Sequence, residues 1–324
     1  MSEECSTTLN EGVRDRACGA LLGLAVGDAV GTTLEFKARD SYAPLTDMIG
    51  GGPFRLAPGV WTDDTSMALA LAESLAERGA LDPADLMERF VRWWRDGEYS
   101  PTGTCFDIGM TTRAALARFE QSGDPIAGSR SPDAAGNGSL MRLAPVAIYG
   151  LSAGVTPMRG AARIQSATTH AARTCLDACE AWSVIVHAAI GGASLGNALK
   201  AASTLDLTEP IAAIAGGSWQ GKPRDAIRSS GYVVHSFEAA LWCVGQGGDF
   251  REVILRAANL GDDADTTAAI TGQLIGALVG ETGIPVEWLD RLAWRERIKC
   301  VADRLISLMD GNVSPSTTLE GPAF

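Results

Sequence analysis

Apolar side chains recur about every 3.6 residues along most of the chain, which is the period of an α-helix. Near the N-terminus, one helical face contains four apolar residues, Ala17, Ala20, Leu21 and Leu24. The same period predicts an Ala-rich helix over residues 171–190 and one or two helices over residues 286–309. Only the G-Y-V-V run at 231–234 has the composition of a strand. Because no series of alternating segments occurs, the sequence predicts an all-α fold.

Two segments carry the signals of a helix start. Asp82 is expected to be the N-cap of a helix that has Pro83 at its first position. The apolar face that follows it contains Leu86, Phe90 and Trp93. The pair Thr156–Pro157 repeats the signal and predicts a second helix start of the same kind.

The chain contains 37 glycines, and many of them lie inside apolar helical segments such as 19–27 and 270–280. A glycine inside a helix costs about 1 kcal/mol relative to alanine. Close approach of two helix backbones, or of a helix and a ligand, would offset this cost. A tightly packed helical core without any ligand explains the same pattern, so the glycines leave both interpretations open.

The 324 residues are compatible with one large domain. Neither an internal repeat nor a Pro/Ser-rich linker divides the chain before residue 310. We expect a flexible N-terminus at residues 1–12 and a compact single-domain helical bundle at residues 13–309. The tail at residues 310–324 lacks periodicity and is expected to be disordered.

The chain is acidic, with a formal net charge of -12, and its Lys and Arg residues are scattered. This distribution excludes a basic surface for nucleic acid or an anionic membrane, and it fits a protein that collects cations. The acidic N-terminus is no secretory signal, and no stretch of 18 residues is expected to span a bilayer. The seven cysteines lack the spacing of a disulfide framework and are expected to be reduced. We therefore expect a cytoplasmic protein with no membrane or nucleic-acid partner.

Two acidic segments stand directly before predicted helices. Their polar side chains are Thr62, Asp63, Asp64 and Thr65 in the first segment, and Asp262, Asp263, Asp265, Thr266 and Thr267 in the second. N-capping explains either segment alone, because Asp and Thr are favoured caps and early acidic residues complement the helix dipole.

The two segments together favour a metal site. One cap needs one side chain, whereas these helix starts supply five carboxylates and several hydroxyls. Packing this much negative charge near a core is unfavourable unless cations neutralise it. Oxygen ligands of this kind select Mg²⁺, Mn²⁺ or Ca²⁺ rather than zinc. If the two helix starts face each other, an aspartate of the second segment can bridge two ions.

Three further features are compatible with a bound nucleotide. The G-N-G-S loop consists of Gly136, Asn137, Gly138 and Ser139. It stands before an apolar helix, so backbone N–H groups are available to a phosphate, although this sequence is also an ordinary turn with a cap. The ring of Tyr232 can stack on a base or pack against its neighbours. His170 can donate to a phosphate or ribose, or it can be a structural residue.

These motifs resemble the ADP-ribosylglycohydrolase family, and within it the bacterial dinitrogenase-reductase-activating glycohydrolase type. The resemblance runs from about Arg14 to Gly280. It rests on five motifs in a fixed order: G-A-L-L-G-L-A-V-G-D-A-V-G-T-T-L-E, W-T-D-D-T, G-N-G-S-L-M-R, G-Y-V-V-H-S-F-E-A-A-L-W and G-D-D-A-D-T-T-A-A-I-T-G. It implies a compact all-α domain with a dinuclear magnesium or manganese centre. The termini and residues 196–228 lie outside the resemblance.

The resemblance implies a set of ligands for two Mg²⁺ or Mn²⁺ ions. The ligands expected for one ion are Thr62, Asp63, Asp64 and Asp265, and those for the other are Asp263, Asp265 and Thr266. Asp265 would then bridge the two ions. Asp262 aligns with a position that the family does not usually place on metal.

The resemblance also implies positions for the substrate. Glu35 matches a glutamate over the reacting ribose, although it can also be a solvated residue at a helix end. Asp107, in C-F-D-I-G, matches an acidic position of arginine-directed members, where a carboxylate pairs with the departing guanidinium. The G-N-G-S loop and His170 would contact the ribose and diphosphate, while Gly231 and Tyr232 would frame the adenine.

The implied reaction is hydrolysis of the N-glycosidic bond between ADP-ribose and an arginine side chain of a modified protein, with ADP-ribose as the product. A metal-bound water would attack the anomeric carbon, with Glu35 or Asp64 as general base, or the reaction would follow a ring-opened route. The alternative substrates are serine-linked ADP-ribose, a free ADP-ribose derivative and another nucleoside-like glycoside. A non-catalytic ADP-ribose-binding protein and a helical protein whose aspartates are only caps are alternatives from other functional classes.

Overall fold

The computed structural model describes residues 3–308, with side chains from residue 11 onward. The helices in the first half of the chain are α1 (Glu3–Gly31), η1 (Thr32–Leu34), α2 (Asp63–Arg78), α3 (Pro83–Asp96), α4 (Met110–Ser122), η2 (Pro132–Ala134), α5 (Ala144–Ala153) and α6 (Val155–Thr169). Those in the second half are α7 (Arg173–Ile190), α8 (Leu195–Ala202), α9 (Glu209–Ala215), η3 (Arg224–Ala226), α10 (Val233–Gly245), α11 (Phe250–Ala258), α12 (Ala264–Val279), η4 (Glu281–Gly283), α13 (Val286–Arg291) and α14 (Arg295–Ser307).

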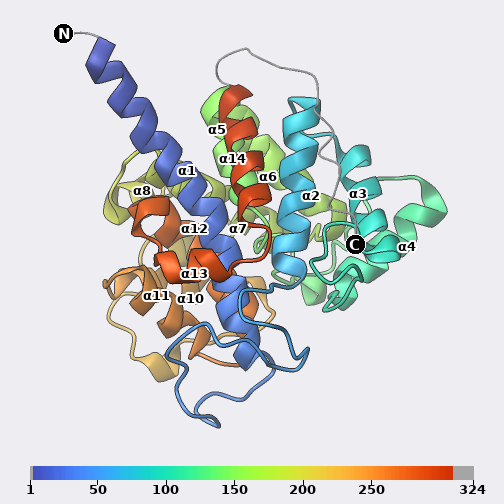
Figure 1. Cartoon of the computed structure of the whole chain (residues 1–324). Helices are drawn as coiled ribbons and strands as arrows, with labels where there is room; N and C mark the ends of the chain where they lie inside the picture. Colours follow the sequence, from blue (N-terminus) through green and yellow to red (C-terminus); the bar gives the residue numbers. More distant parts are fainter. Residues whose placement is uncertain (1–2, 309–324) are drawn as a thin grey trace.

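The described residues form a single helical bundle, which confirms the predicted all-α class. Helix α1 runs through the bundle and packs along α12, with α7 and α14 also beside it (Figure 1). The pair α2 and α3 packs on one side of this centre, and α10 and α11 pack on another. Long loops connect η1 to α2 and α3 to α4. These loops matter for the site described below.

Within the described part of the chain, β structure is limited to three isolated bridges. The run at 231–234, which alone has the composition of a strand, forms no strand. Tyr232 makes one bridge to Gly136, and Val233 is already the first residue of α10. Helix α10 buries Val233 against the bundle, so tertiary packing overrides the strand propensity of the Val-Val pair.

The two predicted helix starts have different outcomes. Asp82 caps α3 as expected, because its Oδ1 accepts from the backbone N–H of Ala84 at 3.0 Å. The start expected at Thr156–Pro157 is wrong by two residues, since α6 begins at Val155 with Gly154 at its N-cap. Pro157 consequently lies in the first turn, where its missing N–H removes no helical hydrogen bond.

The closest helix packing joins α1 and α12 in an antiparallel pair. Four glycines of α1, spaced four residues apart, face α12: Gly19, Gly23, Gly27 and Gly31. A Cβ atom added to any of them would overlap backbone atoms of α12 or of Gly280 directly after it, and the same is true of Gly272 and Gly276 toward α1. We call these six residues the glycine seam. The glycines of both predicted helices therefore serve close backbone approach, and their helix-propensity cost is offset by contact between the two helices.

The expectation that no stretch of the chain could span a bilayer is wrong for residues 11–34, which include most of α1. By length and composition this stretch is apolar enough to cross a bilayer, contrary to the sequence analysis. Its most apolar window is entirely buried inside the bundle. A core helix of a large domain passes the same test as a membrane span, because both lack a polar face.

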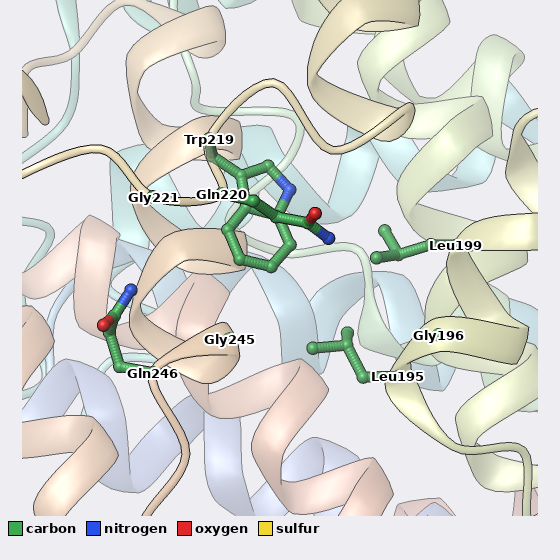
Figure 2. Close-up of a pocket in the computed structure, with 8 residues that line it drawn as sticks. All are labelled: Leu195, Gly196, Leu199, Trp219, Gln220, Gly221, Gly245 and Gln246. Carbon is green, nitrogen blue, oxygen red and sulfur yellow. The ribbon is translucent and has the colours of Figure 1, made fainter.

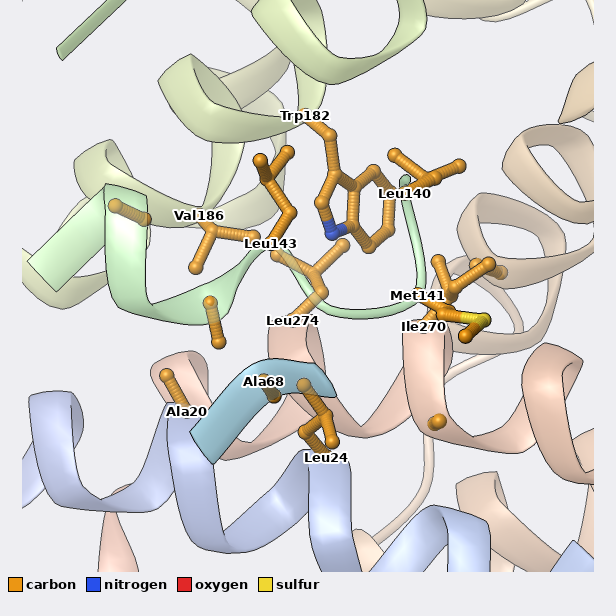
Figure 3. Close-up of a cluster of buried hydrophobic side chains, with 14 of the residues drawn as sticks. Ala20, Leu24, Ala68, Leu140, Met141, Leu143, Trp182, Val186, Ile270 and Leu274 are labelled. Atoms are coloured by element: carbon orange, nitrogen blue, oxygen red, sulfur yellow. The ribbon is translucent and has the colours of Figure 1, made fainter. Parts of the chain in front are cut away.

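The hydrophobic core lies where α1, α2, α7 and α12 meet (Figure 3). Trp182 of α7 sits between the residues that follow the G-N-G-S loop and those of α12, including Leu140 and Ile270. Its indole Nε1 donates to Gln273 Oε1 at 3.1 Å, so the polar atom of the buried ring is satisfied. Gln273 Nε2 in turn donates to the carbonyl oxygens of Leu140 and Met141. This network attaches the residues that follow the G-N-G-S loop to α12.

The structure describes only part of the segments that the sequence analysis proposed as domain limits. Helix α1 begins at Glu3, inside the segment 1–12 that was expected to be a flexible N-terminus. The tail at 310–324 lies outside the described residues. The domain limits therefore stay predictions.

We expect Gly23→Ala to destabilise the protein by about 1–3 kcal/mol or more, because the new methyl group would overlap the carbonyl oxygen of Gly272. Urea unfolding measures this change in the free energy of unfolding. Gly160→Ala is the matched control: Gly160 lies inside α6, and a Cβ there meets nothing within 4 Å. That variant should gain about 0.5–1 kcal/mol from helix propensity. Equal effects of the two substitutions would contradict a close helix contact at the glycine seam.

Candidate functional site

The site begins at the C-terminal end of α1, where Asp28 holds the start of α2. Asp28 Oδ1 accepts from the backbone N–H and the hydroxyl of Thr62, both at 2.9 Å. Asp28 Oδ2 accepts from the backbone N–H of Thr65 at 3.0 Å and from its hydroxyl at 2.7 Å. Thr62 stands at the N-cap position of α2 but makes no side-chain cap of its own. A carboxylate from another helix therefore takes the capping role.

Glu35 holds the start of α12 in the same way. Its Oε2 accepts from the backbone N–H of Ala264 at 2.8 Å and of Asp265 at 3.3 Å. Asp28 and Glu35 both belong to the motif at residues 19–35, which covers the last part of α1 and continues through η1. Each satisfies free N–H groups of one acidic helix start. The two helix starts are thus fixed relative to a single element.

The two acidic segments, far apart in the sequence, converge. Thr62 Oγ1 lies 3.2 Å from Asp64 Oδ2 and 3.4 Å from Asp265 Oδ2. Thr266 Oγ1 lies 3.4 Å from Asp64 Oδ2. The hydroxyl and carboxylate oxygens of both segments therefore line one small volume.

The carboxylates form two groups that share one residue. One group contains Asp28, Asp64 and Asp265, and the other contains Glu35, Asp263 and Asp265. Within each group, one ligand atom from every residue lies within 4.8 Å of the others. Asp265 belongs to both groups, which is the position that a bridging ligand would occupy. We call these five residues, together with Asp63, the carboxylate cluster.

The cluster lacks compensation by cationic side chains. Among residues 11–308, none of its carboxylates forms an ion pair with Lys or Arg. Burial first, and then the neighbouring carboxylates, raise the pKa values of Asp63 and Asp64 well above the usual value. Burial and Asp265 also raise the pKa values of Asp28 and Asp263 to about 7. Like charges gathered in this way require protons or cations.

The donor set fits hard divalent cations. All candidate ligand atoms are oxygens of carboxylates and hydroxyls, which suit Mg²⁺ or Mn²⁺. Asp64 Oδ1 is buried, and it has no hydrogen-bond partner among the described residues. An unpaired buried carboxylate oxygen costs free energy unless a cation or water occupies its lone pairs.

Asp107 approaches the cluster from the loop between α3 and α4. It is half-buried, and its backbone has a positive φ of 59°. Burial first, and then the charges of Asp63 and Asp265, raise the pKa of its carboxyl group to about 11. The predicted site residues Glu35 and Asp107 therefore both lie beside Asp265.

The G-N-G-S loop borders the same cluster. Asn137 Nδ2 donates to Asp263 Oδ2 at 2.6 Å, and the Asn137 backbone N–H donates to the carbonyl oxygen of Gly231 at 3.0 Å. The backbone N–H groups of Gly138 and Ser139 donate no hydrogen bond within the described part of the chain. Of these two donors, the N–H group of Gly138 belongs to a partly exposed residue next to the cluster and suits an anion. Helix α5 begins only at Ala144, so the expected helix N-terminus does not follow the loop directly.

The other predicted substrate residues lie around this loop. Ser139 is fully buried, backbone included, and its hydroxyl accepts from Ser166 Oγ at 2.8 Å. His170 is buried at the end of α6, with its ring against Gly136 and Gly138. Burial first, and then Arg142, lower the pKa of His170 to about 3, so the ring is neutral. Tyr232 bridges to Gly136 and is 39% exposed, which leaves its ring accessible to a flat ligand.

Sequence reasoning missed two residues that organise the site. Asp28 was overlooked, although a single Asp in an otherwise apolar helical stretch is a usable signal.

Arg142 is fully buried with no carboxylate partner among the described residues, and its Nη1 donates to the carbonyl oxygen of Gly138 at 3.0 Å. Its Nη2 donates to Gln165 and Thr169 near the end of α6. Burial lowers the pKa of Arg142 to about 9. Arg142 therefore links the loop to the segment that carries His170.

Asp262, which was left out of the expected ligand set, is exposed and outside both carboxylate groups. A surface hollow elsewhere lies between α8, α10 and the loop before α10 (Figure 2). Its lining includes Leu195, Leu199, Trp219 and Gln246, and none of its residues belongs to the carboxylate cluster or the G-N-G-S loop. That hollow is therefore separate from the candidate site.

Known proteins resemble this chain over most of its length. The chain matches the family described as ADP-ribosylglycohydrolase over residues 9–315. It is 47% identical over 304 residues to ADP-ribosylarginine hydrolase Tri1 of Pseudomonas putida (strain GB-1), covering 94% of this chain and 81% of the relative. It is 35% identical over 304 residues to the ADP-ribosyl-(dinitrogen reductase) glycohydrolase of Rhodospirillum rubrum, covering 91% of this chain and 97% of the relative. Among solved structures, one chain titled ADP-ribosylglycohydrolase-related protein complex matches with a TM-score of 0.82 and 40% identity, covering 92% of this chain and 99% of that chain.

Asp265→Asn should raise the melting temperature of the metal-free protein, because it removes a charge shared by both carboxylate groups. The same variant should lose most of the stabilisation that Mn²⁺ gives to the wild type. Thermal unfolding in EDTA and in Mn²⁺ measures both effects. Asp262→Asn is the control, since its exposed side chain is outside the cluster and Asn tolerates the positive φ of 57° at this position. A wild-type protein with no Mn²⁺ shift would refute a metal site here.

The metal-free protein should lose stability as the pH rises from about 4 to about 7. Asp28 and Asp263 have folded-state pKa values of about 7 against an ordinary value of 3.8, so the folded state binds more protons in this window. The stabilisation is complete below the unfolded pKa and is lost as the pH passes the folded pKa. The loss should exceed about 1 kcal/mol, since one pKa unit corresponds to about 1.4 kcal/mol. Urea unfolding in EDTA at several pH values checks the sign, and a rising free energy of unfolding in this range would contradict it.

Proposed function

Because this chain belongs to the ADP-ribosylglycohydrolase family, we propose that it hydrolyses the N-glycosidic bond between ADP-ribose and an arginine side chain of a modified protein. The convergence of the two acidic segments on the shared Asp265 is the observation that carries this proposal. Arginine as the linked residue is supported by the relative from P. putida, which is named for ADP-ribosylarginine. The product is ADP-ribose.

The proposed cofactors are two Mg²⁺ or Mn²⁺ ions. The proposed ligands are Thr62, Asp63, Asp64 and Asp265 for one ion, and Asp263, Asp265 and Thr266 for the other. Ions of this kind hold a diol and lower the pKa of a water molecule. Asp28 positions the Thr62 hydroxyl through their 2.9 Å hydrogen bond, and Asn137 positions the Asp263 carboxylate.

The G-N-G-S loop is the proposed diphosphate site. The free N–H group of the partly exposed Gly138 donates to a phosphate oxygen, as backbone amides do in other anion sites. Gly231 and Tyr232 bind the adenine, with the exposed part of the Tyr232 ring stacked on the base. Neutral His170 packs under the loop and contacts the ribose or diphosphate side. The Asn137–Asp263 hydrogen bond fixes the distance between nucleotide and carboxylates.

Asp107 is proposed to receive the departing guanidinium. Its carboxyl group is half-buried beside Asp63 and Asp265, and their charges disfavour its ionised form. A guanidinium placed against Asp107 compensates this repulsion and gains a charge-assisted hydrogen bond. Because a protonated guanidine leaves more readily than a neutral one, this pairing favours cleavage of an arginine linkage over a serine linkage.

Glu35 or Asp64 is proposed as the general base for the attacking water. Glu35 is held in place by the N–H groups of Ala264 and Asp265. Burial first, and then Asp265 and Asp263, raise the pKa of Glu35 in the metal-free cluster, so Glu35 is available as a base only when cations compensate the neighbouring carboxylates. Asp64 has one buried carboxylate oxygen, Oδ1, without a hydrogen-bond partner among the described residues.

A cytoplasmic location, expected from the sequence, stays a prediction.

In the presence of Mn²⁺ or Mg²⁺, the protein should release ADP-ribose from arginine-ADP-ribosylated protein much faster than from serine-linked substrate. Asp265→Asn should lower this rate by roughly 100-fold or more, since even residues that only support a metal ligand are worth 10- to 100-fold. Asp262→Asn should retain wild-type activity. Chromatographic detection of released ADP-ribose measures each rate. Release from serine alone would overturn the arginine assignment, and binding of ADP-ribose without release from either substrate would indicate a non-catalytic binding protein.

A further inference from the structure

Three phenylalanines form a chain of ring contacts outside the hydrophobic core. The rings of Phe36 and Phe54 have centroids 6.2 Å apart at 74°, and those of Phe54 and Phe106 have centroids 5.3 Å apart at 56°. Phe36 is 68% exposed, and none of the three belongs to the core or packs against it. We call these three residues the aromatic rim. Their contacts are with one another, so burial in the core does not explain their presence.

The aromatic rim is covalently attached to two predicted site residues. Phe36 directly follows Glu35, whose carboxylate binds the start of α12. Phe106 directly precedes Asp107, whose pKa is raised first by burial and then by the charges of Asp63 and Asp265. Phe54 lies in the loop between η1 and α2 and joins the other two rings. The rim therefore connects the two segments that bring Glu35 and Asp107 to the carboxylate cluster.

The rim and the nucleotide-binding elements come from different parts of the chain. The G-N-G-S loop reaches the cluster through Asn137 and Asp263, and Tyr232 pairs with that loop. The rim reaches the cluster through Glu35 and Asp107 instead. In a substrate whose ribose lies at the cluster, the nucleotide leaves toward the loop. The group attached to the anomeric carbon must leave by another side, and the rim, with an exposed Phe36 and half-buried Phe54 and Phe106, is the candidate surface for it.

The backbone at the rim is held in a sparsely populated conformation. Phe36 and Asp107 have positive φ values of 61° and 59°, which bulky or non-Gly residues rarely adopt. Hydrogen bonds fix the Phe36 turn: its N–H donates to the Asp262 carbonyl oxygen, and the Asp262 N–H donates to the Lys37 carbonyl oxygen, both at 2.8 Å. Such strain persists where the surrounding structure enforces it, and it clusters at functional sites.

The charges around the rim favour a cationic occupant. Glu35 and Asp107, which are outside the proposed metal ligands, lie on the cluster side, and neither has a cationic partner among the described residues. Lys37 and Arg55 follow Phe36 and Phe54 in the sequence and have exposed side chains. These two cations are free to point into solvent, whereas the carboxylates are buried beside the reacting position. A flat cation with an apolar stem matches both the rings and the carboxylates.

We propose that the aromatic rim receives the arginine side chain of the ADP-ribosylated target, with the guanidinium and methylenes packed on the faces of Phe36 and Phe54. This inference rests on the proposed function and deepens it by assigning the residues that recognise the leaving group. Serine-linked ADP-ribose presents neither a cation nor a long apolar stem to these rings. The rim therefore contributes to the choice of linkage, together with Asp107.

The test uses ADP-ribosylated agmatine, a guanidine with an aliphatic stem and no protein, beside arginine-ADP-ribosylated protein. Phe36→Ala and Phe54→Ala should each raise KM for both substrates by roughly 3- to 30-fold, the range expected for a cation on an aromatic face. The turnover number kcat should change less than KM. Phe36→Tyr should restore the wild-type KM, because the ring face is kept. Val286→Ala is the control, since Val286 is also exposed, at 62%, and belongs to α13.

A binding measurement separates failure of the rim from failure of the proposed function. Calorimetric titration with ADP-ribosylated agmatine, carried out in the Asp64→Asn background, should show weaker binding when Phe36 is replaced by Ala, while free ADP-ribose should bind equally. If the wild type releases no ADP-ribose from arginine, the proposed function fails, and this titration still tests the rim. Unchanged KM and unchanged binding in both Ala variants would overturn the inference. An effect on the protein substrate alone would overturn the arginine side chain as the occupant.

Discussion

The structure depends on the close approach of α1 and α12. Gly23 and Gly27 allow the backbone of α1 to touch α12, and any larger residue would push the helices apart. The glycine seam ends at Gly31, which faces Ala264, the first residue of α12. Consequently the same contact that builds the core also sets the distance between the end of α1 and the start of α12. A shift of one helix along the other would separate Glu35 from the N–H groups that it caps.

The helix starts make a concentrated negative charge tolerable. Asp63, Asp64 and Asp265 lie in the first turns of α2 and α12, where the helix dipole favours anions. Asp28 and Glu35 add two further carboxylates, and each gains hydrogen bonds from free N–H groups in return. These bonds offset only part of the repulsion, because the pKa values of the aspartates remain raised. The fold therefore holds the carboxylates in place and leaves their charge for cations to neutralise.

Local patterns in the sequence predicted the helical class and the two acidic helix starts, because capping residues and periodicity act over short distances. The convergence of these starts was a condition of the metal hypothesis, and the shared ligand set came from the resemblance. Asp28 was missed because its partners, Thr62 and Thr65, are far away in the sequence. Arg142 was missed for the same reason, since its role depends on contacts with the end of α6. The sequence analysis underestimated the apolar character of residues 11–34, which are long and apolar enough to cross a bilayer and whose most apolar window is buried in the bundle. The start of α6 differed by only two residues, within the usual uncertainty of helix ends.

Helices and loops divide the site between them. The carboxylates come from helix ends, whose positions are fixed by packing, so the geometry of the cluster is set by the core. The groups proposed for the leaving-group side, Asp107, Phe54 and Phe106, come from the loops before α2 and α4, which the core constrains less. Loops tolerate changes in sequence and length better than packed helices do. A protein with this fold can therefore keep one hydrolytic centre for ADP-ribose while its loops set which linked side chain fits beside it.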